Sequence, residues 1–110
     1  MTTESDLDEF DEATFESEVL GAEGLVLVDF WGEQCVSCKQ LRKVLNQLSS
    51  EIPADVRIGA VNATANPDLA ERFGVRGVPA LLFFKNGEIV DMRTGVDRRQ
   101  VLKKLVESHA

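Results

Sequence analysis

The chain has 110 residues, of which 44% are hydrophobic and 28% charged, a balance that is typical of one globular domain and excludes a disordered chain. Its formal net charge of -7 repels phosphate backbones and anionic lipids, so we expect neither a nucleic-acid partner nor a membrane partner. No stretch approaches the roughly 20 apolar residues of a membrane-spanning helix.

The first twenty residues combine an acidic start with two short predicted elements. Segment 1–6 is polar, and we expect it to be flexible. We expect a single domain over 1–110. Because the start lacks the basic residues and apolar core of a secretory signal, we expect this domain to stay in the cytoplasm. The pattern then predicts a short edge strand over 7–10 and a helix over 12–20, which Gly21 ends.

Residues 25–30 form a short apolar run rich in β-branched residues, which predicts a strand buried on both faces. Asp29 interrupts this run. An ionised carboxylate is costly in such a place, so we expect a raised pKa for Asp29 that suits general-base chemistry near neutral pH. The alternative is an ordinary aspartate at a strand end that reaches solvent.

The only two cysteines of the chain, Cys35 and Cys38, follow this strand. Apolar residues recur at helical spacing from 41 to 48, so the pair lies where a strand gives way to a helix that runs to about Ser49. The free amides and the dipole of a helix start favour negative charge, so we expect the Cys35 thiol to ionise readily. Cys38 lies on the same face and is placed to attack a mixed disulfide formed at Cys35.

Two other interpretations of the cysteine pair are weaker. A structural disulfide that closes so small a ring contributes only about 2 kcal/mol through chain entropy. A structural zinc site takes four ligands, and the only histidine, His109, lies beside the C-terminal residue, which leaves a metal shared between two chains as the remaining metal hypothesis. In a reducing cytoplasm, a redox-active pair is the better interpretation.

The middle of the chain adds a second strand and a short helix. Residues 56–62 predict a strand that runs parallel to 25–30, because a helix connects the two. Asn66 as N-cap, Pro67 at the first helical position and Asp68 in the first turn predict a helix start, and Gly74 ends that helix.

The last third of the chain predicts a β-hairpin and a C-terminal helix. The strand 80–84 is followed by the turn signal Asn86-Gly87, which predicts an antiparallel strand over 89–94. Asp97 and Gln100 resemble a capping box ahead of a helix with apolar residues at 101, 102, 105 and 106. The order of elements predicts an α/β fold with a mixed sheet and helices on both of its faces.

Several motifs, in their order and spacing, resemble those of the thioredoxin family. They extend from about Phe10 to the C-terminus and comprise Val28-Asp29-Phe30-Trp31, Cys35-x-x-Cys38-Lys39, Asn66-Pro67, Phe73-Gly74-Val75-Arg76-Gly77-Val78-Pro79, Phe84-Lys85-Asn86-Gly87 and Gly95. The resemblance implies a thioredoxin fold, with a central mixed sheet of four to five strands flanked by helices.

The resemblance also implies a role for each matching residue. Cys35 is the expected attacking thiolate, Cys38 the resolving thiol, and Asp29 the proton acceptor for Cys38. Val78 and Pro79 are expected to form a cis-proline loop that pairs with a substrate backbone, although an ordinary trans proline is the simpler expectation from the residues alone. The other implied substrate-binding residues are Trp31, Gly77 and Gly95. For Trp31, the alternative from the residues alone is a plain core position.

Five positions depart from the family pattern. Val36-Ser37 replaces the usual Gly-Pro; the added donors at Ser37 stabilise a Cys35 thiolate and predict a reduction potential less negative than is typical. Gln34 replaces a tryptophan, which bears on recognition by the usual reductase. Lys43 replaces a helix-kinking proline, so we expect a straighter helix. Ala60 replaces a lysine that usually accompanies the buried acid, and without this cation we expect Asp29 to be harder to ionise.

The sequence therefore predicts a thiol-disulfide oxidoreductase that reduces disulfides in client proteins by exchange at Cys35 and Cys38. It implies no bound cofactor and no metal. The resemblance implies a thioredoxin reductase-type electron donor as partner. The alternatives are an oxidant or isomerase that uses the same pair, and a binding or chaperone module of the same fold with little catalytic turnover.

Overall fold

The computed structural model describes residues 7–110, so the predicted flexibility of segment 1–6 lies outside the described residues. Within that range the elements are, in chain order, β1 (Asp8–Phe10), η1 (Glu16–Leu20), β2 (Leu25–Trp31), α1 (Val36–Leu48), β3 (Arg57–Asn62), α2 (Pro67–Arg72), β4 (Ala80–Lys85), β5 (Glu88–Thr94) and α3 (Arg99–His109). No helix in residues 7–110 is long and apolar enough to cross a membrane.

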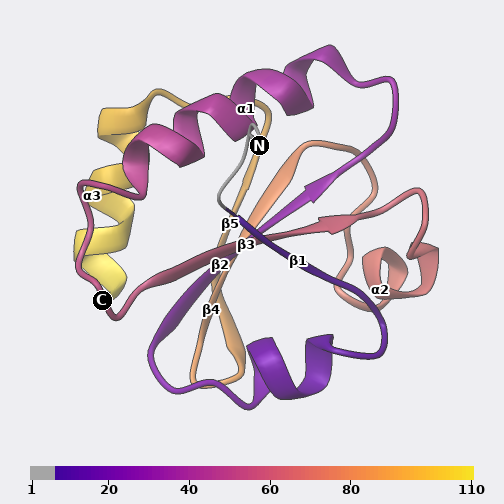
Figure 1. The fold of residues 1–110 in the computed structure, drawn as a ribbon, viewed down its shortest axis with the longest axis horizontal. Coiled ribbons are helices and arrows are strands. Elements are labelled where there is room, and N and C mark those ends of the chain that lie inside the picture. The colour runs from indigo at the N-terminus through magenta and orange to yellow at the C-terminus, as the bar shows by residue number, and fades with distance from the viewer. Residues whose placement is uncertain (1–6) are drawn as a thin grey trace.

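The strands form one five-stranded sheet in the order β1-β3-β2-β4-β5. β3 pairs in parallel with both β1 and β2, whereas β4 pairs antiparallel with β2 and β5. In Figure 1 the sheet crosses the middle of the molecule, with α1 and α3 on one side and η1 and α2 on the other. The predicted mixed sheet with helices on both faces is therefore confirmed.

β2 lies at the centre of this sheet, and its side chains alternate between two cores. Val26, Val28 and Phe30 join the core beneath η1 and α2. Leu25 and Leu27 join the core beneath α1 and α3. Since successive side chains of a strand point to opposite faces, Asp29 faces the α1 side.

The predicted helix over 12–20 is wrong in its first part. An oxygen of the Asp11 side chain accepts the amides of Ala13 and Thr14, each at 3.0 Å, and this local bonding holds residues 12–14 in a turn. The helix proper covers only Glu16–Leu20 and is widened into a π-helix, with the Gly21 amide donating to the Glu16 carbonyl at 2.8 Å.

The predicted capping box at the start of the last helix is also wrong. Both carboxylate oxygens of Asp97 accept from Arg93, at 2.8 and 3.1 Å, so Asp97 is not available to cap. Arg98 holds the N-cap position of α3 and makes no side-chain cap bond.

The start of α2 is only partly as predicted. Asn66 does hold the N-cap position and Pro67 the first turn, but Asn66 makes no side-chain cap bond. Its side-chain oxygen instead accepts the Glu12 amide at 3.3 Å.

The predicted hairpin turn and the predicted first long helix are both present. Asn86 and Gly87 have φ angles of 52° and 85°, which are the positive values a type I′ turn requires. α1 continues as a helix through Lys43 and ends at Leu48, with Ser49 as its C-cap. That α1 is straighter than in typical family members stays a prediction.

Candidate active site

Cys35 and Cys38 lie where β2 leads into α1, as the sequence predicts, and they are joined by a disulfide with Cα atoms 5.2 Å apart. Cys35 is the N-cap of α1, and its sulfur accepts the amide of Cys38 at 3.1 Å. Cys38 is 4% exposed, whereas Cys35 is only half-buried. An external sulfur can therefore reach Cys35 but not Cys38.

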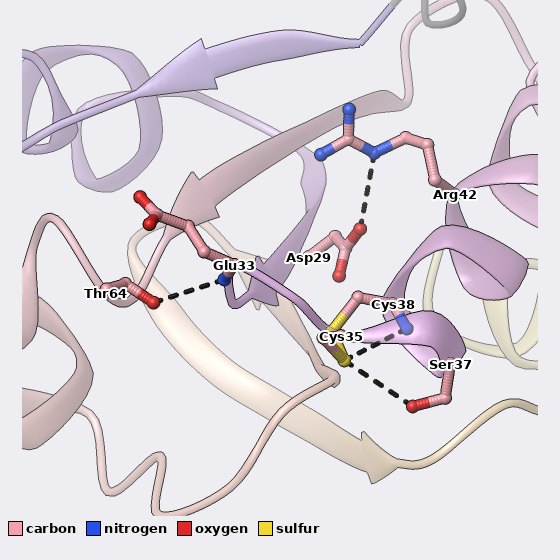
Figure 2. The surroundings of a disulfide bond; sticks show 7 residues. All are labelled: Asp29, Glu33, Cys35, Ser37, Cys38, Arg42 and Thr64. Atoms are coloured by element: carbon pink, nitrogen blue, oxygen red, sulfur yellow. Dashed lines mark hydrogen bonds and ion pairs between the residues drawn. A yellow bond between two sulfur atoms is a disulfide. The ribbon is translucent and has the colours of Figure 1, made fainter.

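The two residues between the cysteines differ in their contacts. The Ser37 hydroxyl lies 3.5 Å from the sulfur of Cys35, as Figure 2 shows, and it is a donor that a proline at this position lacks. The Val36 side chain is 73% exposed and leaves an apolar surface beside the sulfurs.

Asp29 lies at the bottom of the site and is fully buried. Neither of its carboxylate oxygens has a hydrogen-bond partner among the described residues. Burial raises the pKa of Asp29 to about 7, an effect that the positive charge of Arg42 partly offsets and the negative charge of Glu9 reinforces. The predicted rise in the pKa of Asp29 is confirmed, and the alternative of an aspartate that reaches solvent is excluded.

The absence of a cation at position 60 does not leave Asp29 without one. That Asp29 is harder to ionise than it would be with a lysine at position 60 stays a prediction. Ala60 is indeed its in-register neighbour on β3. However, Arg42 reaches Asp29 from α1, with its Nε atom 3.6 Å from a carboxylate oxygen. This separation is longer than an ordinary hydrogen bond, so the contact is an ion pair. In Figure 2 the Asp29 carboxylate lies between Arg42 and the disulfide.

The loop between the strand end and Cys35 is held by its neighbours. The amide of Glu33 donates to the Thr64 hydroxyl at 3.2 Å (Figure 2). A Cβ atom added at Gly32 would lie 3.0 Å from a methyl carbon of Val78. Because Gly32 has no side chain, the loop that carries Val78 packs directly against the segment before the cysteines.

Four of the predicted substrate-binding residues, Gly77, Val78, Pro79 and Gly95, line one shallow groove of about 290 Å³. The peptide bond between Val78 and Pro79 is cis, as the family resemblance implies. The Gly95 amide donates to the Pro79 carbonyl at 3.1 Å, which ties the two walls together. The other residues that line the groove are Gly74, Val75, Arg76, Ala80, Met92 and Thr94.

Trp31 lies apart from this groove. Its indole nitrogen donates to a carboxylate oxygen of Glu9 at 3.4 Å, and the Arg42 guanidinium lies over its ring, 5.6 Å from the centroid. Trp31 thus contacts the charged groups around Asp29.

Arg42 and Glu9 also belong to the site, and neither is among the residues predicted from the sequence. Arg42 did carry a signal, because it lies four residues after Cys38 in a predicted helix and therefore on the same face. Glu9 carried none, since it lies in a short edge strand far from the cysteines in the sequence. In residues 7–110, no cluster of three or more His, Cys, Asp or Glu side chains is arranged to hold a metal ion.

Comparisons with known proteins point in one direction. The family model described as Thioredoxin matches residues 6–108. Thioredoxin C-2 of Corynebacterium nephridii is 40% identical over 95 residues, which are 86% of this chain and 88% of that protein. Thioredoxin 1 of a Nostoc species is 34% identical over 98 residues, which are 89% and 92% of the two chains. The thioredoxin of Rickettsia bellii is 32% identical over 96 residues, which are 87% of this chain and 91% of that protein.

Proposed function

The chain belongs to the thioredoxin family, and from this premise we propose that Cys35, Cys38 and Asp29 together catalyse its disulfide exchange. The protein is a thiol-disulfide oxidoreductase that reduces disulfides in other proteins. The observation that best supports the three roles is the layering of the site, from a half-buried Cys35 through a buried Cys38 to a fully buried Asp29.

The first step takes place at Cys35. In the reduced protein its thiolate attacks one sulfur of a client disulfide, forms a mixed disulfide and releases the other client sulfur as a thiolate. The position of Cys35 at the start of α1 favours this thiolate, because the Cys38 amide points at the sulfur at 3.1 Å.

The second step releases the client. Asp29 accepts the proton of the Cys38 thiol, and the Cys38 thiolate attacks the sulfur of Cys35. The mixed disulfide breaks, the second client sulfur leaves as a thiolate, and the Cys35–Cys38 disulfide remains. Two electrons have then passed from the protein to the client. A carboxyl whose pKa is raised to about 7 by burial is suited to exchange this proton near neutral pH.

Client chains bind along the groove beside the cysteines. Val78 offers its backbone before the cis bond to Pro79, and Gly77 and Gly95 leave room for a client backbone. Among residues 7–110, no atom beyond the adjacent residues lies within 4 Å of a Cβ added at either glycine. Trp31 supports the site from beside Asp29. We place this activity in the cytoplasm, with a thioredoxin reductase-type donor returning electrons to the disulfide and no bound cofactor.

A second candidate function is oxidation or isomerisation of client disulfides by the same pair. The hydroxyl of Ser37, 3.5 Å from the Cys35 sulfur, favours it, because a donor to the thiolate stabilises the reduced form. The two functions differ in the reduction potential of the pair and not in the residues that carry the chemistry.

An equilibrium redox titration in dithiol buffers, scored by alkylation of free thiols, separates these functions. A reversible two-electron transition near about -270 mV supports a general reductant, and one near about -180 mV supports the oxidant or isomerase. Absence of a reversible transition contradicts both and supports a binding module.

The individual roles are tested with insulin as a disulfide-bonded client. Cys38→Ser is expected to trap a mixed disulfide with it, whereas Cys35→Ser forms none. Asp29→Asn is expected to slow release of the client without slowing formation of the mixed disulfide. Equal trapping by both cysteine variants would refute the assigned order of attack.

A further inference from the structure

A row of three residues crosses the sheet under α1. Glu9 on β1 is in register with Ala60 on β3, and Ala60 is in register with Asp29 on β2. In-register neighbours point to the same face of a sheet, and for Asp29 this is the face covered by α1. Two carboxylates therefore face α1 from strands about 10 Å apart, and the in-register residue on the strand between them is Ala60, whose side chain is a methyl group.

Arg42 spans these two carboxylates from α1. Its Nε atom lies 3.6 Å from Asp29, and a terminal nitrogen lies 3.2 Å from Glu9. Trp31 secures the arrangement, because its indole nitrogen donates to Glu9 and its ring lies beneath the guanidinium. The guanidinium is thus fixed by Glu9 and Trp31 at its outer end and presents its inner edge to Asp29.

The charges in this row act on Asp29 in opposite directions. Arg42 on α1 favours the ionised carboxylate, and Glu9 on β1 opposes it. The in-register neighbours on β3 and β4, Ala60 and Leu81, are apolar and bring no charge. Cys38 faces the same space from one turn earlier on α1.

We propose that Arg42 is a positioning residue for the exchange reaction: anchored by Glu9 and Trp31, it holds a positive charge beside Asp29 and favours the ionised carboxylate that accepts the proton of Cys38. The inference rests on the proposed role of Asp29 as proton acceptor. The cation beside Asp29 thus comes from Arg42 on α1, because Ala60 on β3 carries no charge. The small side chain of Ala60 leaves room for Arg42 between the two carboxylates.

The direct test is an NMR titration of the Asp29 carboxyl in the oxidised full-length protein. Arg42→Gln is expected to raise the titration midpoint by about one pH unit, a tenfold change in its proton affinity, because a cation within 4 Å is lost. Arg72→Gln is the matched control: Arg72 also pairs with a glutamate, at 3.5 Å, and lies over an aromatic ring, but on α2. It is expected to leave the midpoint unchanged.

A relocated charge distinguishes electrostatics from a loss of packing. In the double variant Arg42→Gln with Ala60→Lys, a cation enters from β3, and the midpoint is expected to return toward the wild-type value. Glu9→Gln alters a half-exposed side chain and keeps an oxygen that can accept from Arg42 and Trp31, so the anchor remains while a negative charge is removed. This variant is expected to lower the midpoint. An unchanged midpoint in Arg42→Gln overturns the inference.

The pH dependence of client release separates this inference from the function on which it rests. If both hold, Arg42→Gln moves the pH of half-maximal release upward with the carboxyl midpoint, and Asp29→Asn removes this pH dependence. If Asp29→Asn changes the profile but Arg42→Gln moves neither quantity, the role of Arg42 fails and that of Asp29 stands. If Asp29→Asn leaves the profile unchanged, the role of Asp29 itself fails, and with it that of Arg42.

Discussion

The sulfurs of Cys35 and Cys38 differ in their hydrogen-bond donors and in their exposure. Cys35 has the Cys38 amide at 3.1 Å and the Ser37 hydroxyl at 3.5 Å, whereas Cys38 is buried over Asp29. Donors that point at a sulfur stabilise its thiolate and hence the reduced state of the pair. The residues between the cysteines therefore influence the reduction potential without taking part in the exchange.

Ser37→Ala is expected to make the reduction potential of the pair more negative by about 10 to 20 mV. A contact of this length to a partly exposed thiolate contributes about 0.5 to 1 kcal/mol, and 30 mV corresponds to about 1.4 kcal/mol for two electrons. The measurement is a redox titration in dithiol buffers, with Ser37→Thr as the control that keeps the hydroxyl. A potential that rises or stays unchanged in Ser37→Ala contradicts a donor role for Ser37.

At the scale of elements, short connections hold the strands in the register that the site needs. The turn between β4 and β5 packs on the loop before β2, where the Asn86 side chain accepts the Gly24 amide at 3.0 Å. The same turn lies against η1, because a Cβ atom added at Gly87 would be 2.8 Å from the Leu20 carbonyl oxygen. One turn thus joins β4, β2 and η1.

Gly87→Ala is expected to destabilise the protein by about 1 to 2 kcal/mol more than Gly74→Ala. Both glycines have positive φ angles, 85° and 76°, so both variants acquire the same backbone strain. Of the two, only Gly87 has a backbone atom in the way, whereas no atom of the described chain beyond the adjacent residues lies within 4 Å of a Cβ at Gly74. Urea unfolding of the two variants gives the difference directly, and equal losses would show that the turn has room to move away from η1.

At the scale of the whole molecule, the buried carboxyl connects the active site to global stability. Asp29 is fully buried, and its pKa is raised to about 7 from 3.8, chiefly by that burial. Between these two pH values the folded protein holds a proton that the unfolded chain releases. Raising the pH across this window therefore favours unfolding, and the effect ends once both states are ionised.

The oxidised protein is expected to lose stability between about pH 4 and pH 7, with an Asp29 contribution on the order of 4 kcal/mol. Asp29→Asn cannot ionise and is expected to lack this loss, so its free energy of unfolding relative to wild type should rise across the window. Urea unfolding at several pH values measures both curves. Asp68→Asn, which changes an exposed carboxylate on α2, is the control and should follow the wild-type curve. A wild-type curve parallel to that of Asp29→Asn would exclude a raised pKa.

Much of the fold, together with the cysteine pair and the buried carboxyl of the site, could be predicted from residues close together in the sequence. The cysteine pair at a strand-to-helix junction, the buried strand around Asp29 and the Asn86-Gly87 turn depend on local spacing and backbone preference, and the structure has all three. The two wrong helix starts also have local causes. The Asp11 side chain accepts a nearby backbone amide and the Asp97 side chain pairs with Arg93, and patterns of capping and periodicity do not include such contacts.

Tertiary structure alone decided which charges surround Asp29. The sequence by itself determined that a carboxyl is buried beside two cysteines and that Ala60 brings it no cation. Whether another cation replaces it depends on the register of β1, β3 and β2 and on how α1 crosses them, which place Arg42 between Asp29 and Glu9. These distances join residues 13 and 33 positions apart along the chain, and only packing of the helix on the sheet brings such residues together.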